Sequence, residues 1–243
     1  MHHITSHHGT KIAYHQLKGK SPGIIFFGGF MSDMTGTKAT YLEAACQRWG
    51  QAYIRFDYSG HGQSSGKFEE GTIGSWLKDA LCVLDNLTKG PQIIVGSSMG
   101  GWLMTLAALK RPERIKALVG IASAPDFVED LGRMHAVQQE ALLKDGVCYL
   151  PSLSGEKSYP ITRHLIEEGR THCVLKAPIP ISCPVRLLHG LSDKDVPWQK
   201  SVKLADRLES LDVTVTLIKD GDHRLSDPTQ LLLLEKSVYS LLE

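Results

Sequence analysis

A serine between two glycines is the group in this chain best suited to nucleophilic chemistry. Ser98 lies in the sequence GSSMG at residues 96–100, directly after the apolar run IIV at residues 93–95. Glycines at both flanking positions permit a sharp turn from a strand into a helix, where the backbone is strained and a Cβ would clash. Such a turn exposes the serine hydroxyl for attack on a carbonyl carbon. The alternative is a glycine-rich turn whose serine only caps the following helix.

A serine hydroxyl is a weak nucleophile at neutral pH, so an imidazole must accept its proton and a carboxylate must orient that imidazole. Two later loops, each after an apolar strand-like run, supply these groups. The first loop carries Asp193 and Asp195, and the second carries His223. Asp126 also follows a strand-like run, although a cap of the strand end is its more ordinary role. The serine, one aspartate and His223 therefore form a candidate catalytic triad.

The tetrahedral intermediate formed by such a serine carries a negative oxygen, which backbone N–H groups must stabilise. We expect one donor from Met99, the residue after the nucleophile, at the positive end of the following helix. We expect the second from Phe30, in the glycine-rich segment FGGFM at residues 27–31, which follows an early strand. The alternative for this segment is an ordinary glycine-rich turn.

Two other histidines and a second glycine-rich turn are assigned structural roles. The segment FDYSGHGQS, residues 56–64, contains glycines that permit a sharp loop beneath the candidate site. His61 lies within this turn, and His189 lies at the start of the loop that carries the candidate acids. Both are better explained as loop residues that bond to backbone than as catalytic groups.

Strand-like and helix-like segments alternate through most of the chain, which predicts a doubly wound, mostly parallel α/β sheet. Short apolar runs of the kind buried in a parallel sheet fall at residues 24–27, 52–56, 93–95, 117–121, 185–188 and 213–218. Helical spacing of apolar residues lies between them. The segment at residues 11–15 alternates, which favours an antiparallel edge strand. Asp227 and Pro228 are typical of the start of a final helix.

The alternation stops between about residues 127 and 182, a stretch too long for an ordinary connection. Helix-like patterns at residues 128–143 and 161–175 flank glycines and prolines, with no convincing strand between them. We therefore expect one domain over residues 1–243, with this stretch inserted as a helical cap above the sheet. Its apolar residues could shelter an acyl chain, although packing within the cap is the better explanation of them.

Composition argues against several other classes of protein. The 243 residues carry a formal net charge of +1 and no basic stripe, which argues against capture of nucleic acid or an anionic membrane. No apolar stretch is long enough to span a bilayer, and the first residues resemble no targeting segment. The five cysteines form no Cys-x-x-Cys pair and the eleven histidines show no metal-binding spacing. We therefore expect a reduced, cytoplasmic protein without metal or cofactor.

Taken as a set, the motifs resemble the alpha/beta-hydrolase domain-containing protein ten family. The resemblance is carried by RFDYSG at residues 55–60, GSSMGGWLM at 96–104, RLLHG at 186–190 and VPWQ at 196–199. It implies an α/β-hydrolase fold with Ser98 as nucleophile, Asp193 as acid and His223 as base. The frame Gly-x-x-Asp-x-x-Val-Pro favours Asp193 over Asp195, and the chain order serine, aspartate, histidine is that of the superfamily.

That family is associated with palmitoyl-protein thioesterase and acyl-glucuronide esterase activities, so the resemblance implies hydrolysis of an acyl thioester or carboxylic ester through an acyl-enzyme. The substrate would be a small molecule or a protein that carries the acyl group. Carbon–carbon bond hydrolysis, serine peptidase action and a catalytically silent binding protein stay open, since fold does not fix substrate. Animal members are mitochondrial, which makes a mature mitochondrial protein the alternative to a bacterial cytoplasmic one.

Overall fold

The computed structural model describes residues 1–6, 9–130, 134–151 and 158–242. Eight strands form one sheet in the order β1-β2-β4-β3-β5-β6-β9-β10. They are β1 (His2–Thr5), β2 (Lys11–Leu17), β3 (Lys20–Phe27), β4 (Gln51–Phe56), β5 (Gln92–Ser97), β6 (Ile115–Ile121), β9 (Val185–Gly190) and β10 (Val213–Ile218). Every pairing from β4 to β10 is parallel. The prediction of a mostly parallel α/β sheet is confirmed.

The antiparallel edge of the sheet lies one strand further out than the sequence predicts. β2 contains the segment expected at the edge, but it pairs on one side with β4 and on the other with β1. The prediction of an edge position for β2 is therefore wrong. β1 has only four residues, HHIT, and is mostly exposed, so no apolar pattern indicated it. A short polar strand of this kind limits edge-to-edge pairing with other chains.

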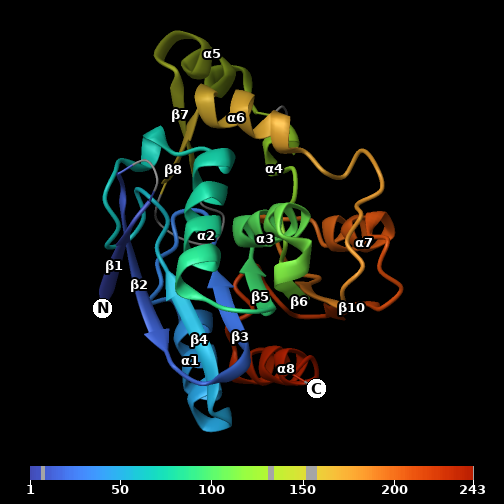
Figure 1. Ribbon diagram of the computed structural model, residues 1–243. Coiled ribbons are helices and arrows are strands. Elements are labelled where there is room, and N and C mark those ends of the chain that lie inside the picture. The colour runs from blue at the N-terminus through green and yellow to red at the C-terminus, as the bar shows by residue number, and fades with distance from the viewer. Residues whose placement is uncertain (7–8, 131–133, 152–157, 243) are drawn as a thin grey trace.

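Helices cover both faces of the sheet (Figure 1). α2 and α3 pack with α7 over one core, and α1 and α8 over the other. Alternate residues of one strand serve the two cores: in β5, Ile94 faces the first, and Ile93 and Val95 face the second. Burial on both faces explains the continuous apolar runs. The bounds are α1 (Thr37–Trp49), α2 (Ile73–Leu87), α3 (Met99–Lys110), α7 (Gln199–Arg207) and α8 (Pro228–Tyr239), with short 3-10 turns η1 (Phe68–Glu70), η2 (Pro112–Arg114) and η4 (Arg170–His172).

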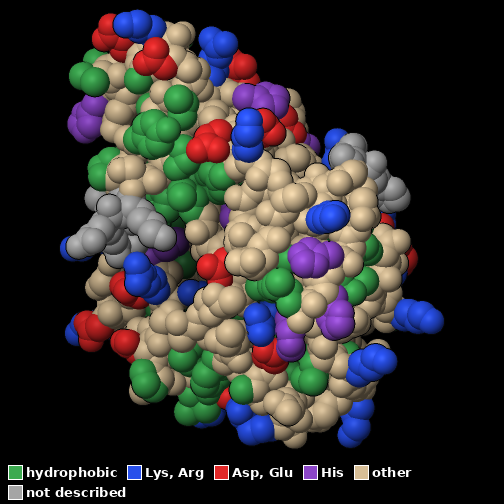
Figure 2. Space-filling view, turned by 90° about the vertical axis from the view of Figure 1, so that its left-hand side faces the viewer, with side chains coloured by type: hydrophobic (Ala, Val, Ile, Leu, Met, Phe, Trp, Pro, Cys, Tyr) green, Lys and Arg blue, Asp and Glu red, His purple; other side chains and the backbone are tan. Residues whose placement is uncertain are grey.

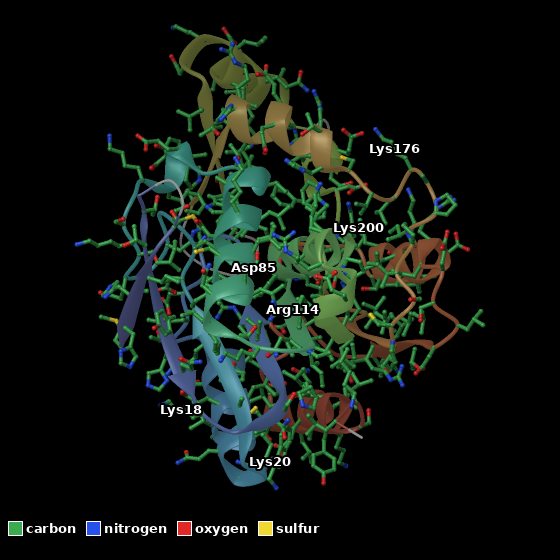
Figure 3. All side chains as sticks on the ribbon, viewed as in Figure 1. Lys18, Lys20, Asp85, Arg114, Lys176 and Lys200 are labelled. Carbon is green, nitrogen blue, oxygen red and sulfur yellow. The ribbon has the colours of Figure 1, made fainter. Side chains whose placement is uncertain are left out.

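Charged side chains are spread over the surface and tie elements together. On the face shown in Figure 2, acidic and basic side chains are interspersed and form no continuous basic area. Asp85 on α2 pairs with Arg111 at 2.9 Å and with Arg114 at 3.7 Å, which joins α2 to η2 (Figure 3).

Among the helices that the structure describes, none has the length and apolar character needed to cross a membrane.

Between β6 and β9 the chain leaves the sheet and forms a cap (Figure 1). The cap contains α4 (Phe127–Asp130), α5 (Ala136–Asp145), β7 (Val147–Pro151), β8 (Ser158–Thr162) and α6 (Arg163–Gly169). The prediction of a cap without strands is wrong, because β7 and β8 form an antiparallel pair. Prolines at positions 151 and 160 suggested loops, yet a two-stranded pair has outer edges where a proline's missing N–H is tolerated. The helix expected at residues 128–143 occurs as α4 and α5, with residues 131–133 outside the described part.

Asp126 ties the end of the cap to the sheet. It follows β6 with a left-handed backbone, φ 56°, and its side chain is buried. The carboxylate accepts hydrogen bonds from the N–H groups of Val174 and Leu175, both at 2.8 Å. Two roles for Asp126 were considered from the sequence. The structure supports hydrogen bonding to backbone N–H groups and not catalysis, because both carboxylate oxygens accept from the backbone of residues 174 and 175.

We expect Asp126→Ala to destabilise the protein. The substitution leaves two N–H groups without their acceptor, and an unsatisfied buried donor costs about 1–3 kcal/mol. Asp126→Asn is the matched control, since it keeps one acceptor oxygen and tolerates a positive φ. Thermal unfolding should place the melting temperature of Asp126→Ala several degrees below that of wild type, with Asp126→Asn between them. Equal melting temperatures for Asp126→Ala and wild type would contradict the tether.

Candidate active site

Ser98 occupies a strained turn between β5 and α3. Its backbone has φ 54° and ψ −118°, a conformation that costs a non-glycine residue about 1–3 kcal/mol. The turn needs glycine two residues before and two residues after Ser98. A Cβ on Gly96 would clash with the carbonyl group of Gly100, and a Cβ on Gly100 would clash with the carbonyl oxygen of Phe27. The turn therefore presents the serine hydroxyl at the carboxyl ends of the parallel strands.

Ser98, His223 and Asp193 form one hydrogen-bonded chain across three loops. Nε2 of His223 lies 3.1 Å from Oγ of Ser98, and Nδ1 of His223 lies 2.7 Å from Oδ2 of Asp193. The Asp193 side chain is fully buried, whereas that of His223 is 19 % exposed. Because the carboxylate accepts a hydrogen bond from the Nδ1–H group of His223, Nε2 is left without a proton and can accept that of the serine. The structure thus brings together the three residues expected to act as a triad.

A further histidine, His189, holds the buried carboxylate. Its Nε2 lies 3.1 Å from Oδ2 of Asp193 and 3.0 Å from the carbonyl oxygen of Val196, so this nitrogen carries the proton. Its Nδ1 then accepts a hydrogen bond of 2.7 Å from the hydroxyl of Ser201. His189 and Ser201 are both fully buried. The expectation that His189 bonds only to backbone is therefore incomplete, because it also orients Asp193.

The pKa of Asp193 lies well below its ordinary value. Burial alone would raise this pKa, but hydrogen bonds from His189 and His223, the charge interaction with His223 and the N–H of Val196 together outweigh burial. The stabilisation that comes with a lowered carboxyl pKa is present above the ordinary aspartate pKa and is lost as the pH falls through the folded value. Asp193 therefore stays ionised throughout the neutral range.

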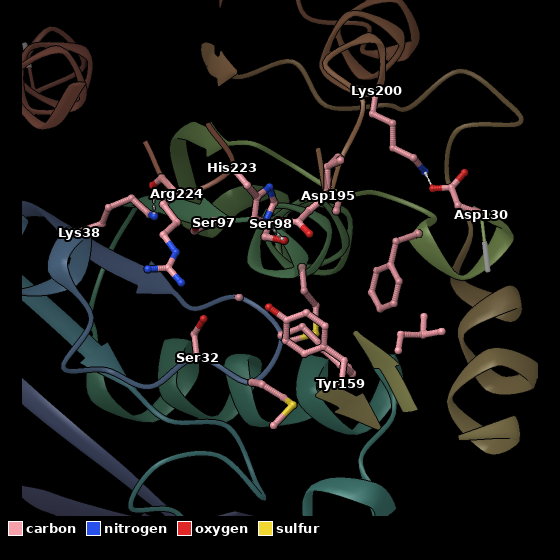
Figure 4. A pocket seen from close by; sticks show the side chains of 18 of the residues that line it. Ser32, Lys38, Ser97, Ser98, Asp130, Tyr159, Asp195, Lys200, His223 and Arg224 are labelled. Carbon is pink, nitrogen blue, oxygen red and sulfur yellow. Dashed lines mark hydrogen bonds and ion pairs between the residues drawn. The ribbon is translucent and has the colours of Figure 1, made fainter. Parts of the chain in front are cut away.

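Asp195 lies in the same loop but does not contact His223 through a hydrogen bond in the described structure. It lines the cavity beside Ser98 (Figure 4), and its N–H donates to Oδ1 of Asp193 at 2.9 Å. Asp193, Asp195 and His223 are also the one group among the described residues whose spacing fits a metal ion. The hydrogen bond between Asp193 and His223 accounts for the closeness of two of these three residues.

Phe30 and Met99, the expected oxyanion donors, both line the cavity that contains Ser98. Met99 is the first residue of α3, where N–H groups have no acceptor within the helix. The Phe30 loop passes directly over the serine, since a Cβ on Gly29 would lie 3.4 Å from Cβ of Ser98. Gly29, the residue before Phe30, therefore lies beside the nucleophile candidate.

An aromatic cluster fixes the side chain of Phe30. Its ring packs edge-on against Phe68, Trp76, Phe127 and Tyr159, with ring centroids 4.8 to 5.9 Å apart. These four rings come from η1, α2 and the two cap elements α4 and β8. The cap thus holds in place the loop that carries the expected oxyanion donor.

Asp57 supports the same loop from below. Its carboxylate accepts hydrogen bonds from the N–H of Met34 at 2.6 Å and the N–H of Gln63 at 2.8 Å. Any Cβ on Gly62 would clash with this carboxylate, which explains the glycine there. The structural role expected for residues 56–64 therefore includes support of the loop that follows β3.

A cavity of about 810 Å³ lies over Ser98, between the sheet and the cap. This volume is typical of pockets for small organic ligands. Figure 4 shows Lys38 and Arg224 on one side of Ser98 and Tyr159 on another. The apolar lining includes Phe30, Met99, Phe127, Leu150, Tyr159 and Ile161, and the polar lining includes Ser32, Thr37, Lys38, Arg224 and Ser226. The site can therefore accommodate a molecule with one apolar and one polar end.

The charged form of Lys38 is largely buried, which lowers the stability of the folded protein. Burial lowers the pKa of Lys38 to about 8, with smaller effects from the charges of Asp222, which raises it, and Arg224, which lowers it. Because the folded pKa lies below the unfolded value, the unfolded chain binds more protons between the two values, and stability rises with pH across this window.

We expect Lys38→Met to be more stable than wild type at pH 7, where the cost of the buried charge is fully present. After allowance for partial exposure the gain should be about 1 kcal/mol, or roughly 2–4 °C in melting temperature. The gain should shrink as the pH rises through 8 toward 10.5. Thermal unfolding of both proteins across this pH range measures it, and a gain independent of pH would contradict the burial of a charged lysine.

Comparisons with known proteins identify the family. A family model described as the alpha/beta hydrolase fold matches residues 24–149. The bovine (Bos taurus) protein named palmitoyl-protein thioesterase ABHD10, mitochondrial, is 48 % identical over 96 % of this chain and 76 % of its own length. The chain belongs to the alpha/beta hydrolase fold family, in its ABHD10 group. The predictions of the family and of a hydrolase enzyme are confirmed.

Two solved structures resemble this alpha/beta hydrolase along nearly its whole length, cap included. Mouse alpha/beta hydrolase domain-containing protein 10 superposes with a TM-score of 0.93 at 46 % identity, covering 99 % of this chain and 97 % of its own. A provisionally named hydrolase of Agrobacterium vitis S4 gives a TM-score of 0.96 at 38 % identity, covering 100 % and 98 %. The α/β-hydrolase fold with its cap is therefore shared with a mammalian and a bacterial protein.

Sequence reasoning missed two parts of this hydrolase's site. His189, which lies in β9 and not in the loop expected from the sequence, stands four residues before Asp193, and that spacing was a usable signal for a contact between them. Lys38 and Arg224 reach the cavity from α1 and from the loop after β10. No local pattern indicated that these two residues would meet, because the fold alone brings their loops together.

Proposed function

We propose that this hydrolase cleaves acyl thioesters and carboxylic esters by attack of Ser98 on the carbonyl carbon. The observation that carries the proposal is the unbroken hydrogen-bonded chain from Ser98 through His223 to the buried Asp193. It opens into a cavity with an apolar side. The bovine relative is named a palmitoyl-protein thioesterase, which supports a thioester substrate.

In the acylation step, Oγ of Ser98 forms a bond to the carbonyl carbon while Nε2 of His223 takes the hydroxyl proton. The negative oxygen of the tetrahedral intermediate accepts hydrogen bonds from the N–H groups of Met99 and Phe30. Asp193 keeps the imidazole oriented and stabilises its charged form. The intermediate collapses when the bond to the leaving sulfur or oxygen breaks, and His223 donates its proton to that atom.

Deacylation repeats these roles with water as the nucleophile. His223 takes a proton from the water as its oxygen attacks the acyl-enzyme, and returns it to Oγ of Ser98 as the carboxylic acid leaves. No other group is required for proton balance. The aromatic cluster around Phe30 keeps the expected oxyanion donor rigid during both steps.

The apolar lining supports a substrate with a hydrocarbon acyl chain. Leu150, Tyr159 and Ile161 come from β7 and β8, and Phe127 comes from α4, so the cap supplies a large part of this surface. Burial of each methylene contributes about 0.8 kcal/mol.

A panel of thioesters that share one thiol and vary from acetyl to palmitoyl tests this proposal. We expect kcat/KM to rise with chain length until the apolar side of the cavity is filled, and Ser98→Ala to abolish hydrolysis of every member. Oxygen esters of the same acids should follow the same order. A flat profile, or a preference for acetyl, would contradict a long-chain acyl substrate.

The compartment is a separate proposal. The bovine relative is named as mitochondrial, which supports the mitochondrial alternative for this chain over the cytoplasmic one. The expectations of a small-molecule or protein-linked acyl substrate and of no nucleic-acid partner stay predictions.

A further inference from the structure

An ion pair in the wall of the cavity takes no part in the hydrolysis described above. Nζ of Lys200 lies 2.7 Å from Oδ2 of Asp130 and donates a hydrogen bond of 2.8 Å to the carbonyl oxygen of Pro125. Both Lys200 and Asp130 line the cavity over Ser98. Figure 4 shows the pair on the opposite side of Ser98 from Lys38. Because Lys200 belongs to α7 and Asp130 to α4, the pair joins the body of the protein to the cap at this side of the cavity.

The position of Lys200 is explained by these contacts and not by its own helix. Lys200 is the second residue of α7, where a cation faces the positive end of the helix dipole. In α7, all of which is described, no acidic residue lies in the first turn and no side-chain hydrogen bond caps the helix at Trp198. The Lys200 side chain is nevertheless only 13 % exposed. A cation placed this deeply needs acceptors, and Asp130 and Pro125 supply two of them.

The pair lies where the apolar lining ends. Phe127 and Asp130 are three residues apart in α4, so their side chains project on the same side of the helix, and both line the cavity. The Asp130 side chain is 48 % exposed, so the cavity reaches solvent at this point. An acyl chain that runs from Ser98 past Phe127 therefore meets the ion pair next.

Apolar and charged walls affect an acyl chain in opposite ways. Each methylene buried against Phe127 and its apolar neighbours should raise kcat/KM by about fourfold. A methylene placed against the ion pair would instead displace water from the half-exposed carboxylate of Asp130, and the loss of that hydration is unfavourable. The gain from further chain length should therefore stop at the pair.

We propose that the ion pair of Lys200 and Asp130 is a specificity determinant that sets the longest acyl chain from which this hydrolase gains activity. The proposal rests on the proposed function and deepens it, since the apolar residues bind the chain and the ion pair ends the chain-binding part of the cavity. Replacement of the pair by apolar side chains should extend that part, because methionine and leucine carry no charge that needs hydration. A buried ion pair can often be replaced in this way without loss of stability.

Thioesters of pantetheine with acyl groups from hexanoyl to eicosanoyl, in steps of two carbons, test this role. Each is assayed below the concentration at which it aggregates. The variants are Lys200→Met/Asp130→Leu, which removes the pair, and Lys200→Arg, which keeps it. The matched control is Glu129→Leu/Lys176→Met, which breaks an ion pair that Glu129 of the same helix makes at 3.1 Å. Neither Glu129 nor Lys176 is among the described residues that line the cavity.

In wild type, kcat/KM should rise with chain length to a limit and then stay level. In Lys200→Met/Asp130→Leu the limit should move about two to four carbons further. The ratio of kcat/KM for the longest chain to that for hexanoyl should then exceed the wild-type ratio by about tenfold. Lys200→Arg and Glu129→Leu/Lys176→Met should keep the wild-type limit.

Binding of the same thioesters to Ser98→Ala, measured by calorimetry, separates the role of the pair from turnover. Affinity should level off at the wild-type limit, and at a longer chain when the pair is removed in the same background. Thermal unfolding checks that each variant is folded at the assay temperature. If the double variant is not, Lys200→Met alone breaks the same pair and should move the limit in the same direction.

The same limit in wild type and in a folded variant without the pair, in both turnover and binding, would overturn the proposal and leave the proposed function standing. A wild-type profile that rises without a limit would overturn it as well. Failure of wild type to hydrolyse any thioester would contradict the proposed function alone, because the binding measurement still decides the role of the pair.

Discussion

Ser98→Ala and His223→Ala are each expected to lower kcat for thioester hydrolysis by about four to six orders of magnitude. Alanine at position 98 removes the atom that bonds to the carbonyl carbon, and alanine at position 223 removes the group that moves both protons. Because the two residues act in one step, the double variant should be little slower than either single variant. Steady-state and single-turnover kinetics on an octanoyl thioester measure these effects.

The control for this prediction is stability. The Ser98 hydroxyl contacts His223 at the partly exposed end of the network, so Ser98→Ala should unfold within a few degrees of wild type. Ser97→Ala, a neighbouring serine that lines the same cavity, should keep activity within about tenfold and is the matched variant. Activity of Ser98→Ala above a hundredth of wild type, or additive losses in the double variant, would contradict the mechanism.

Asp193→Asn is expected to lower kcat by about three to four orders of magnitude, whereas Asp195→Asn should change it by less than about threefold. Asp193 accepts from two imidazole N–H groups at Oδ2 and from the N–H groups of Asp195 and Val196 at Oδ1. An amide nitrogen would face donors in either orientation. The asparagine would also favour the tautomer of His223 that cannot accept the serine proton.

Asp193→Asn should destabilise the protein as well, so its kinetics are to be measured well below its own melting temperature. Circular dichroism at the assay temperature separates a slow folded enzyme from an unfolded fraction. If Asp195→Asn lowered kcat by orders of magnitude and Asp193→Asn left it nearly unchanged, Asp195 and not Asp193 would be the carboxylate that acts with His223.

The three candidate catalytic residues could be predicted from the sequence, because each follows a strand of the parallel sheet. Parallel strands place their carboxyl ends at one edge, so loops after β5, β9 and β10 had to meet there, and Ser98, Asp193 and His223 followed. Glycine at positions 96 and 100 was interpretable because the turn leaves no space for a Cβ. The choice between two acids only two residues apart came from motif position, and the structure brings Asp193 to His223.

The strands of the cap and the supporting residues of the site could not be predicted, because they depend on contacts that local sequence patterns do not encode. β7 and β8 pair with each other in the cap. Pro151 and Pro160 suggested that no strand forms there, and no local pattern indicated that the two segments would pair. His189 in β9 gains its contact with Ser201 only when α7 packs against that strand. Lys38 enters the cavity from a helix more than 180 residues before Arg224 in the chain. Such long-range meetings follow from the topology and not from composition or periodicity.

Labelling with a fluorophosphonate, followed by peptide mapping, tests most directly the claim that Ser98 is an activated nucleophile. The account predicts one covalent adduct on the peptide that contains Ser98, blocked by prior incubation with a thioester substrate and absent in Ser98→Ala and His223→Ala. No adduct on the native, folded protein, or an adduct that persists in Ser98→Ala, would contradict it.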